Sequence, residues 1–155
     1  MLPLSFTRTA PSPLYPDLPA PTTLDLLDPQ ATDEFFRKLQ SSPQTRITHL
    51  IHCAAERRPD VAEADPARAS ELNEKVTQRL SALAKELGFG LVYISTDYVF
   101  DGARPPYEVE DEPNPLNLYG RLKRGGEEAV LAVRKEMLEE DFKGKELVVL
   151  RVPLL

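Results

Sequence analysis

The stretch YISTDYVFDG (93–102) changes from apolar to polar within a few residues. The run LVYIS (91–95), which leads into it, is continuously apolar, as is typical of a strand that a parallel sheet buries on both faces. Ser95 and Thr96 follow where that strand is expected to end. Because ligands of open parallel sheets bind at the carboxyl ends of the strands, these two hydroxyls are candidates for a binding or catalytic site.

A tyrosine and a lysine follow downstream in YGRLK (119–123). Tyr119 and Lys123 are four residues apart, so a helix would place them on one face. A lysine ammonium beside a phenol lowers the phenol's pKa from about 10, which suits proton exchange near neutral pH. With Ser95 or Thr96 bonded to the same substrate oxygen, the set suits carbonyl reduction. The alternative is a buried strand, a polar loop and a helix without a chemical role.

Outward from this stretch, apolar runs alternate with amphipathic segments that open on Asp-Pro pairs. Asp28 and Asp65 each supply a helix N-cap followed by a first-turn proline, and Gly88 supplies a C-terminal cap. The alternation predicts an α/β fold with a parallel sheet and right-handed crossovers. Helices are expected at about 29–41, 65–87 and 117–140, and strands at 2–6, 22–26, 46–55, 91–95 and 146–152.

Composition limits the possible partners. Nineteen basic and twenty-five acidic residues give a net charge of -6, which argues against a nucleic-acid or anionic-membrane partner. No apolar run approaches the roughly 18 residues that a membrane helix needs. The single cysteine, Cys53, excludes an internal disulfide and favours a cytoplasmic setting. Its small apolar neighbours predict a buried thiol. His49 and His52 would point to opposite faces of a strand, so no metal site is expected.

Several segments resemble the extended short-chain dehydrogenase/reductase family: HCAAERRPDV (52–61), YISTDYVFDG (93–102), EDEPNPLNLYG (110–120) and Lys123. Within it they are similar to dTDP-4-dehydrorhamnose reductases and to the related regulatory beta subunits of methionine adenosyltransferase. HCAAERRPDV and PLNLYG look more like the regulatory subunits. The resemblance covers roughly residues 22–155 and implies an NADP-binding, Rossmann-like domain.

The resemblance implies roles for five residues in the catalytic set. The family's catalytic hydroxyl matches Thr96 or the adjacent Ser95. Its tyrosine and lysine match Tyr119 and Lys123, which would also contact the cofactor. Asn73 matches a helix asparagine that helps to order a proton-relay water in the wider superfamily.

The resemblance also implies a set of cofactor-binding residues. Asp25 and Leu26 match the acidic and apolar pair that usually lies beside the adenine. Ala54 and Ala55 match small residues that let the backbone pass close to the cofactor. Arg8, in SFTRT, matches a basic residue that accepts a 2′-phosphate.

The family's first strand and its glycine-rich turn have no counterpart, because no glycine precedes Gly88. Neither does the substrate domain that would follow RVPLL (151–155). We therefore expect one incomplete Rossmann-like domain over 1–155, with a proline-rich, irregular start at 1–21. Binding of NADP is expected to be weak or absent.

Three functions fit the sequence. The first is a non-catalytic, NADP-binding regulatory subunit that partners a methionine adenosyltransferase catalytic subunit in S-adenosylmethionine biosynthesis. The second is an NADPH-dependent sugar-nucleotide oxidoreductase of the dTDP-4-dehydrorhamnose reductase type. The third is an inactive fragment. The sequence leaves catalysis open, although we expect no turnover by this chain alone.

Overall fold

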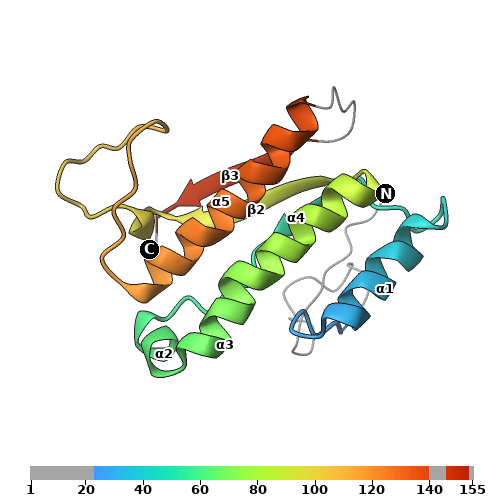
Figure 1. Ribbon diagram of the computed structural model, residues 1–155, viewed down its shortest axis with the longest axis horizontal. Helices are drawn as coiled ribbons and strands as arrows, with labels where there is room; N and C mark the ends of the chain where they lie inside the picture. The colour runs from blue at the N-terminus through green and yellow to red at the C-terminus, as the bar shows by residue number, and fades with distance from the viewer. Residues whose placement is uncertain (1–22, 140–145, 154–155) are drawn as a thin grey trace, which may run out of the picture.

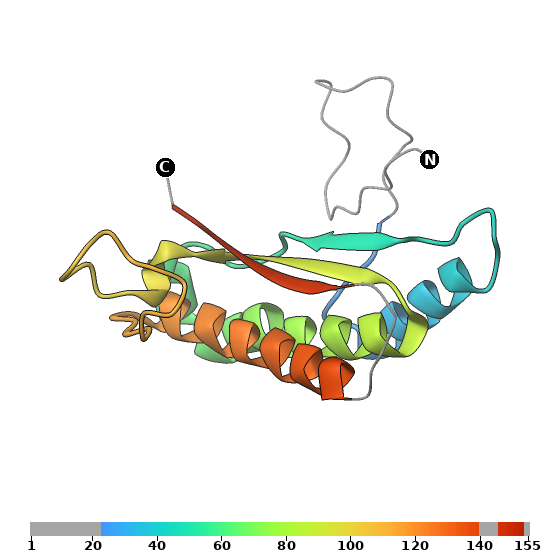
Figure 2. The ribbon, with the colours of Figure 1, turned by 90° about the horizontal axis from the view of Figure 1, so that it is seen from above.

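The computed structural model describes residues 23–139 and 146–153, which form a parallel three-stranded sheet with helices packed on one face (Figures 1 and 2). The α/β fold class predicted from the sequence is therefore confirmed. In chain order the elements are α1 (Pro29–Gln40), β1 (His49–His52), α2 (Pro59–Ala64), α3 (Pro66–Ser70), a π-helical turn (Glu71–Lys75), α4 (Val76–Leu87), β2 (Gly90–Thr96), a 3-10 turn (Asp97–Val99), α5 (Leu118–Glu139) and β3 (Leu147–Val152).

The sheet has the strand order β1-β2-β3, and both neighbouring pairs are parallel. Tyr93 lies opposite His52, and Thr96 lies opposite Val152. The strands therefore end along one edge of the sheet, from which the loops before α2 and α5 emerge. This is the edge where open parallel sheets bind ligands.

The predicted helix caps are present. The Asp28 carboxylate accepts a hydrogen bond from the Ala31 N–H at 3.0 Å, and the Asp65 carboxylate accepts one from the Arg68 N–H at 3.1 Å. Each carboxylate satisfies a backbone donor that the first helical turn leaves unpaired. Gly88 ends α4 with a φ of 72°, a left-handed conformation that glycine adopts without strain.

The core lies between the sheet and the helix layer of α1, α4 and α5 (Figure 2). Its largest fully buried apolar side chains are Phe36, Leu80, Phe89, Leu91 and Tyr93. Among the described residues nothing covers the opposite face of the sheet, where Ile51 is 64% and Leu150 48% exposed. The strand predicted to be buried on both faces is therefore fully buried only towards the helices.

Some predicted boundaries were wrong. Residues 23–25 form no strand, because the Asp25 side chain accepts a hydrogen bond from the Leu27 N–H at 3.0 Å within a turn. The strand expected at 46–55 is only four residues long, and the helix expected at 65–87 is interrupted by the π-helical turn. Helix α2 was not predicted. The strand expected at 2–6 lies outside the described residues.

The two histidines of β1 point to opposite faces, as predicted, whereas the prediction for Cys53 was wrong. His49 is exposed and His52 is buried, on opposite faces of the strand. Cys53 was predicted to be buried but is exposed. Alternate residues of a strand point to the same face, so Cys53 lies on the face of Ile51. No described residue covers that face of the sheet.

No described helix is long and apolar enough to cross a membrane.

Candidate functional site

Thr96 and Tyr119 form the centre of the candidate site. Thr96 is the last residue of β2, and its buried hydroxyl donates to the Asp97 carboxylate at 3.1 Å and accepts from the Tyr98 N–H at 3.2 Å. Tyr119, in the first turn of α5, is 5% exposed and its phenol interacts with the Thr96 hydroxyl. The edge of the sheet thus brings together a hydroxyl and a phenol that are 23 residues apart in sequence.

The pKa of Tyr119 is raised above its ordinary value of about 10. Burial is the largest cause, and the nearby Asp97 carboxylate adds to it. The neighbouring Thr96 hydroxyl and the positive charge of Arg57 act in the opposite direction. The sequence-based expectation that Lys123 lowers this pKa is therefore wrong. At neutral pH the phenol keeps its proton.

Lys123 is buried, with its ammonium turned to the backbone of β2. Its Nζ donates to the Ile94 carbonyl at 2.6 Å and lies 4.0 Å from the centroid of the Tyr93 ring. Burial lowers the pKa of Lys123 to about 8, and the Glu127 carboxylate opposes this shift. The ammonium is thus occupied by a carbonyl and an aromatic face, which explains why it does not stabilise a Tyr119 phenolate.

The sequence left open whether Ser95 or Thr96 supplies the hydroxyl. Ser95 is 2% exposed, and its hydroxyl lies beside the Glu127 carboxylate without a hydrogen bond of ordinary geometry to any described residue. Of the two hydroxyls, that of Thr96 lowers the pKa of the Tyr119 phenol. Thr96 is therefore the better candidate.

Asn73 lies in the π-helical turn and is completely buried. Its side-chain oxygen accepts from the Glu56 N–H at 2.8 Å, and its side-chain amide donates to the Glu56 carbonyl at 2.9 Å. Its own carbonyl accepts from the Thr77 hydroxyl at 3.0 Å. Asn73 therefore fastens the loop after β1 to the helix layer. π-helical turns are frequent at functional sites.

A cavity of about 400 Å³ lies beside this loop. Four of the six described residues that the family resemblance assigned to the cofactor line it, namely Asp25, Leu26, Ala54 and Ala55. Tyr119 and Lys123 do not line it, and Arg8 lies outside the described residues. The fold thus brings together two segments that are almost 30 residues apart in sequence.

The pocket combines an apolar lining with acidic side chains. Leu24, Leu26 and Leu72 supply apolar walls, and Ala54 and Ala55 add two small side chains. The Asp25 carboxylate is an acceptor for ribose hydroxyls or an amino group. A glycine-rich turn for the phosphates has no equivalent among the residues before Gly88.

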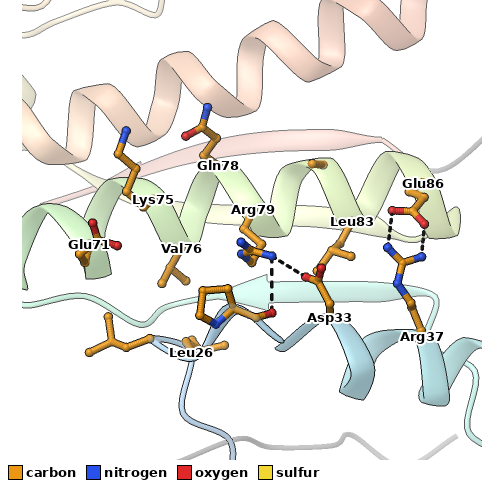
Figure 3. Close-up of a pocket in the computed structure, with 13 residues that line it drawn as sticks. Leu26, Asp33, Arg37, Glu71, Lys75, Val76, Gln78, Arg79, Leu83 and Glu86 are labelled. Carbon is orange, nitrogen blue, oxygen red and sulfur yellow. Dashed lines mark hydrogen bonds and ion pairs between the residues drawn. The ribbon is translucent and has the colours of Figure 1, made fainter. Parts of the chain in front are cut away.

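A second cavity, of about 520 Å³, lies between α1 and α4 (Figure 3). Arg79 pairs there with Asp33 at 2.8 Å, and Arg37 pairs with Glu86 (Figure 3). These four charges neutralise one another across the two helices. Only Leu26 of the predicted site residues lines this cavity.

Sequence reasoning missed the residues that fix the start of α5. The Glu63 carboxylate of α2 accepts from the Leu118 N–H at 3.0 Å, and the Asn117 side chain accepts from the Gly120 N–H at 2.8 Å. The contact with Glu63 spans 55 residues and leaves no local pattern in the sequence. An asparagine three residues before a glycine was the only signal for the second contact.

The parallel sheet, the hydroxyl at a strand end and the helical tyrosine and lysine define the class of Rossmann-like, reductase-type domains. More specifically, the chain belongs to the RmlD substrate binding domain family, which matches residues 8–155.

Relatives of two kinds are similar in sequence. The chain is 49% identical over 108 residues to methionine adenosyltransferase 2 subunit beta of Rattus norvegicus, covering 70% of this chain and 30% of the rat protein. It is 44% identical over 89 residues to dTDP-4-dehydrorhamnose reductase of Mycolicibacterium smegmatis, covering 56% and 27%. The chain thus spans less than a third of the length of either relative.

The fold is similar to that of a reductase crystallised with its cofactor. Superposition on dTDP-4-dehydrorhamnose reductase from Bacillus anthracis in complex with NADP gives a TM-score of 0.70 at 28% sequence identity. It covers 84% of this chain and 41% of that chain.

Proposed function

We propose that this chain is part of an NADP-binding, reductase-like regulatory subunit of methionine adenosyltransferase. The observation that carries the proposal is the 49% identity to the rat beta subunit, which is higher than the 44% identity to the mycobacterial reductase and extends over more residues. Its partner would be a methionine adenosyltransferase catalytic subunit.

The state of Tyr119 also supports a regulatory role. An efficient general acid or base has a pKa near the working pH, whereas burial shifts the pKa of the Tyr119 phenol upwards, away from it. The ammonium of Lys123 donates to the Ile94 carbonyl and therefore does little to stabilise a Tyr119 phenolate. Such a site binds a ligand oxygen better than it exchanges a proton with it.

The pocket residues would hold the cofactor as follows. Asp25, Leu26, Ala54 and Ala55 would take the adenosine half of NADP, which the size and polarity of their pocket fit. The other half would extend towards Thr96 and Tyr119, whose hydroxyls can hydrogen-bond its polar groups. Lys123 and Asn73 would contribute by positioning the strand end and the loop. The nicotinamide, when bound, supplies hydride chemistry.

A cytoplasmic location is part of the proposal. The only cysteine, Cys53, is an exposed free thiol, which suits a reducing compartment.

The second candidate is a dTDP-4-dehydrorhamnose reductase type of oxidoreductase. It is favoured by the contact between the Thr96 hydroxyl and Tyr119, with Lys123 one turn further along α5. In this role Thr96 and Tyr119 would bind the substrate oxygen, and Tyr119 would donate the proton. An inactive fragment remains the third possibility, and the experiment below distinguishes all three.

The experiment combines the purified chain with a methionine adenosyltransferase catalytic subunit. We expect co-elution and a changed KM or rate of S-adenosylmethionine formation, without oxidation of NADPH at 340 nm. Absence of both effects would reject the regulatory role.

A parallel assay supplies NADPH and a dTDP-4-keto sugar. Turnover that Tyr119→Phe abolishes would establish the reductase instead. If neither assay responds, the fragment hypothesis stands.

A further inference from the structure

A buried ion cluster lies next to the candidate site. Glu127 of α5 is completely buried, one helical turn beyond Lys123. Arg151 of β3 donates two hydrogen bonds to its carboxylate, at 2.9 and 2.8 Å, and Arg124 donates a third at 3.3 Å. A buried carboxylate needs such pairing, because an uncompensated charge costs several kcal/mol.

Arg151 connects this cluster to the loop that follows β2. Its guanidinium carbon lies 4.9 Å from the centroid of the Phe100 ring. Phe100 stacks on Tyr107, with ring centroids 4.1 Å apart and planes 5° from parallel. The Tyr107 hydroxyl donates to the Asp101 carboxylate at 2.6 Å, and Asp101 also accepts from the Asn114 amide at 2.9 Å. One chain of contacts thus runs from the buried carboxylate of α5 to the middle of the loop.

This loop, residues 97–117, joins the two halves of the candidate site. It leaves from Thr96 and returns one residue before α5, which carries Tyr119 in its first turn. Tyr98 lies edge-on against Tyr119, with ring centroids 5.9 Å apart. Connections of this length without regular structure are uncommon, and many of them are functional.

We propose that Arg151 is a positioning residue that holds the 97–117 loop against the Thr96–Tyr119 pair. Its guanidinium serves two partners at once, because it donates two hydrogen bonds to the Glu127 carboxylate while its central carbon lies over the Phe100 ring. Lysine cannot form the two parallel hydrogen bonds from one planar group. The inference rests on the proposed function in that it takes this pair as the ligand end of the site.

Hydrogen exchange of the loop amides tests the proposal. The Ala103 N–H donates to Asp101 and the Glu108 N–H to Asp111, so both report on loop order. In Arg151→Met, we expect both to exchange at least about tenfold faster, since local opening governs exchange. Arg151→Lys should restore little of the protection. Arg79→Met is the matched control, because it removes another guanidinium ion pair, which joins α4 to α1.

A second measurement follows the Tyr119 phenol by carbon-13 NMR. Loss of the loop contact should expose the phenol and bring its pKa down towards 10 in Arg151→Met but leave it unchanged in Arg79→Met. Unchanged loop exchange and an unchanged Tyr119 titration in Arg151→Met would overturn the proposal.

Arg151→Met leaves a buried carboxylate with fewer partners and could fail to fold. Phe100→Leu then gives the answer, because it keeps the Glu127–Arg151 pair and removes the ring that Arg151 contacts, together with the stack of that ring on Tyr107. The same increase in exchange is expected, and its absence would overturn the proposal. These measurements need no NADPH, so their outcome is independent of whether the chain binds a cofactor.

Discussion

At Gly120 the backbone of the loop touches α5. A β-carbon there would lie 2.2 Å from the Tyr98 carbonyl oxygen, whereas one at Gly125 would meet only the flexible Glu74 side chain, at 3.2 Å or more. Gly120→Ala should therefore lower the free energy of unfolding by about 1–3 kcal/mol, the usual cost of overpacking.

Gly125→Ala, on the same helix, is the control for helix propensity and should be neutral or stabilising. Urea denaturation of both variants checks this prediction. Equal stabilities of the two variants would refute the close approach of Tyr98.

The buried imidazole of His52 should make the stability of the fold depend on pH. Burial is the main cause that lowers its pKa to about 3, and its ring nitrogen lies 3.1 Å from the Thr77 hydroxyl. The unfolded chain binds this proton near pH 6.5 and the folded chain only near pH 3, so stability falls as the pH drops through that window. The loss from His52 is at most about 1.4 kcal/mol per pH unit.

Urea denaturation at pH 7 and pH 4.5 isolates this effect when His52→Gln is compared with the wild type. The variant should lose less stability between the two pH values. His49→Gln, at an exposed position, should behave like the wild type. The same loss in all three proteins would show that His52 does not contribute.

Single residues were predictable where a local pattern encoded them. Strand-end hydroxyls and a tyrosine in the first turn of a helix are visible in sequence, and the structure brings Thr96 and Tyr119 together. The effect of Lys123 was not predictable from spacing. Its ammonium binds the Ile94 carbonyl, a backbone group 29 residues away that leaves no mark in the residue types.

At the scale of elements, the π-helical turn holds the loop after β1 in place through hydrogen bonds. Asn73 makes two hydrogen bonds to the backbone of Glu56 from a fully buried position. Asn73→Ala should therefore cost about 2–3 kcal/mol of stability, since it leaves a backbone donor and acceptor unpaired. The adjoining pocket, which Glu56 lines, should also lose its shape.

The measurement is urea denaturation combined with hydrogen exchange of the Glu56 amide. Ser70→Ala, in the preceding helix, is the control, because its hydroxyl makes only a 3.3 Å contact with Glu74. Protection of the Glu56 amide that survives in Asn73→Ala would contradict this account.

Helix ends that are marked by a capping residue in the sequence were predicted well. Asp-Pro pairs and Gly88 fixed the start of α1, the start of α3 and the end of α4. Helix α2 and the π-helical turn were missed. Helix α2 opens at Arg58 without a side-chain cap, and the interrupting turn is stabilised by tertiary bonds to the loop after β1.

At the scale of the whole molecule, the sheet is covered on one face only among the described residues (Figure 2). Ile51 and Leu150 are large and exposed on the other face, and parallel sheets normally bury both. Ile51→Thr combined with Leu150→Thr should therefore reduce self-association while leaving the unfolding midpoint nearly unchanged.

Light scattering and binding of a hydrophobic dye check this prediction. Leu91→Thr, on the covered face of β2 and fully buried, is the control and should destabilise the fold strongly. A large loss of stability in the double variant would mean that the exposed face is already packed.

Sequence periodicity predicted the alternation of helices and strands but not this asymmetry. A continuous apolar run such as 91–95 indicates a strand with two apolar faces, and it does not say whether both are covered. The exposure of Cys53 and Ile51 follows from the same asymmetry.

The measurement that tests the central claim most directly is an NMR titration of the nitrogen-15-labelled chain with NADPH. We expect weak binding in fast exchange, with shifts of the Leu26, Ala54, Ala55 and Thr96 amides, because the pocket that we propose for the adenosine is present, whereas no glycine-rich turn precedes Gly88. Arg79 and Glu86, in the groove between α1 and α4, should not shift (Figure 3). No shifts at the pocket, or shifts confined to that groove, would contradict the assignment of a cofactor site.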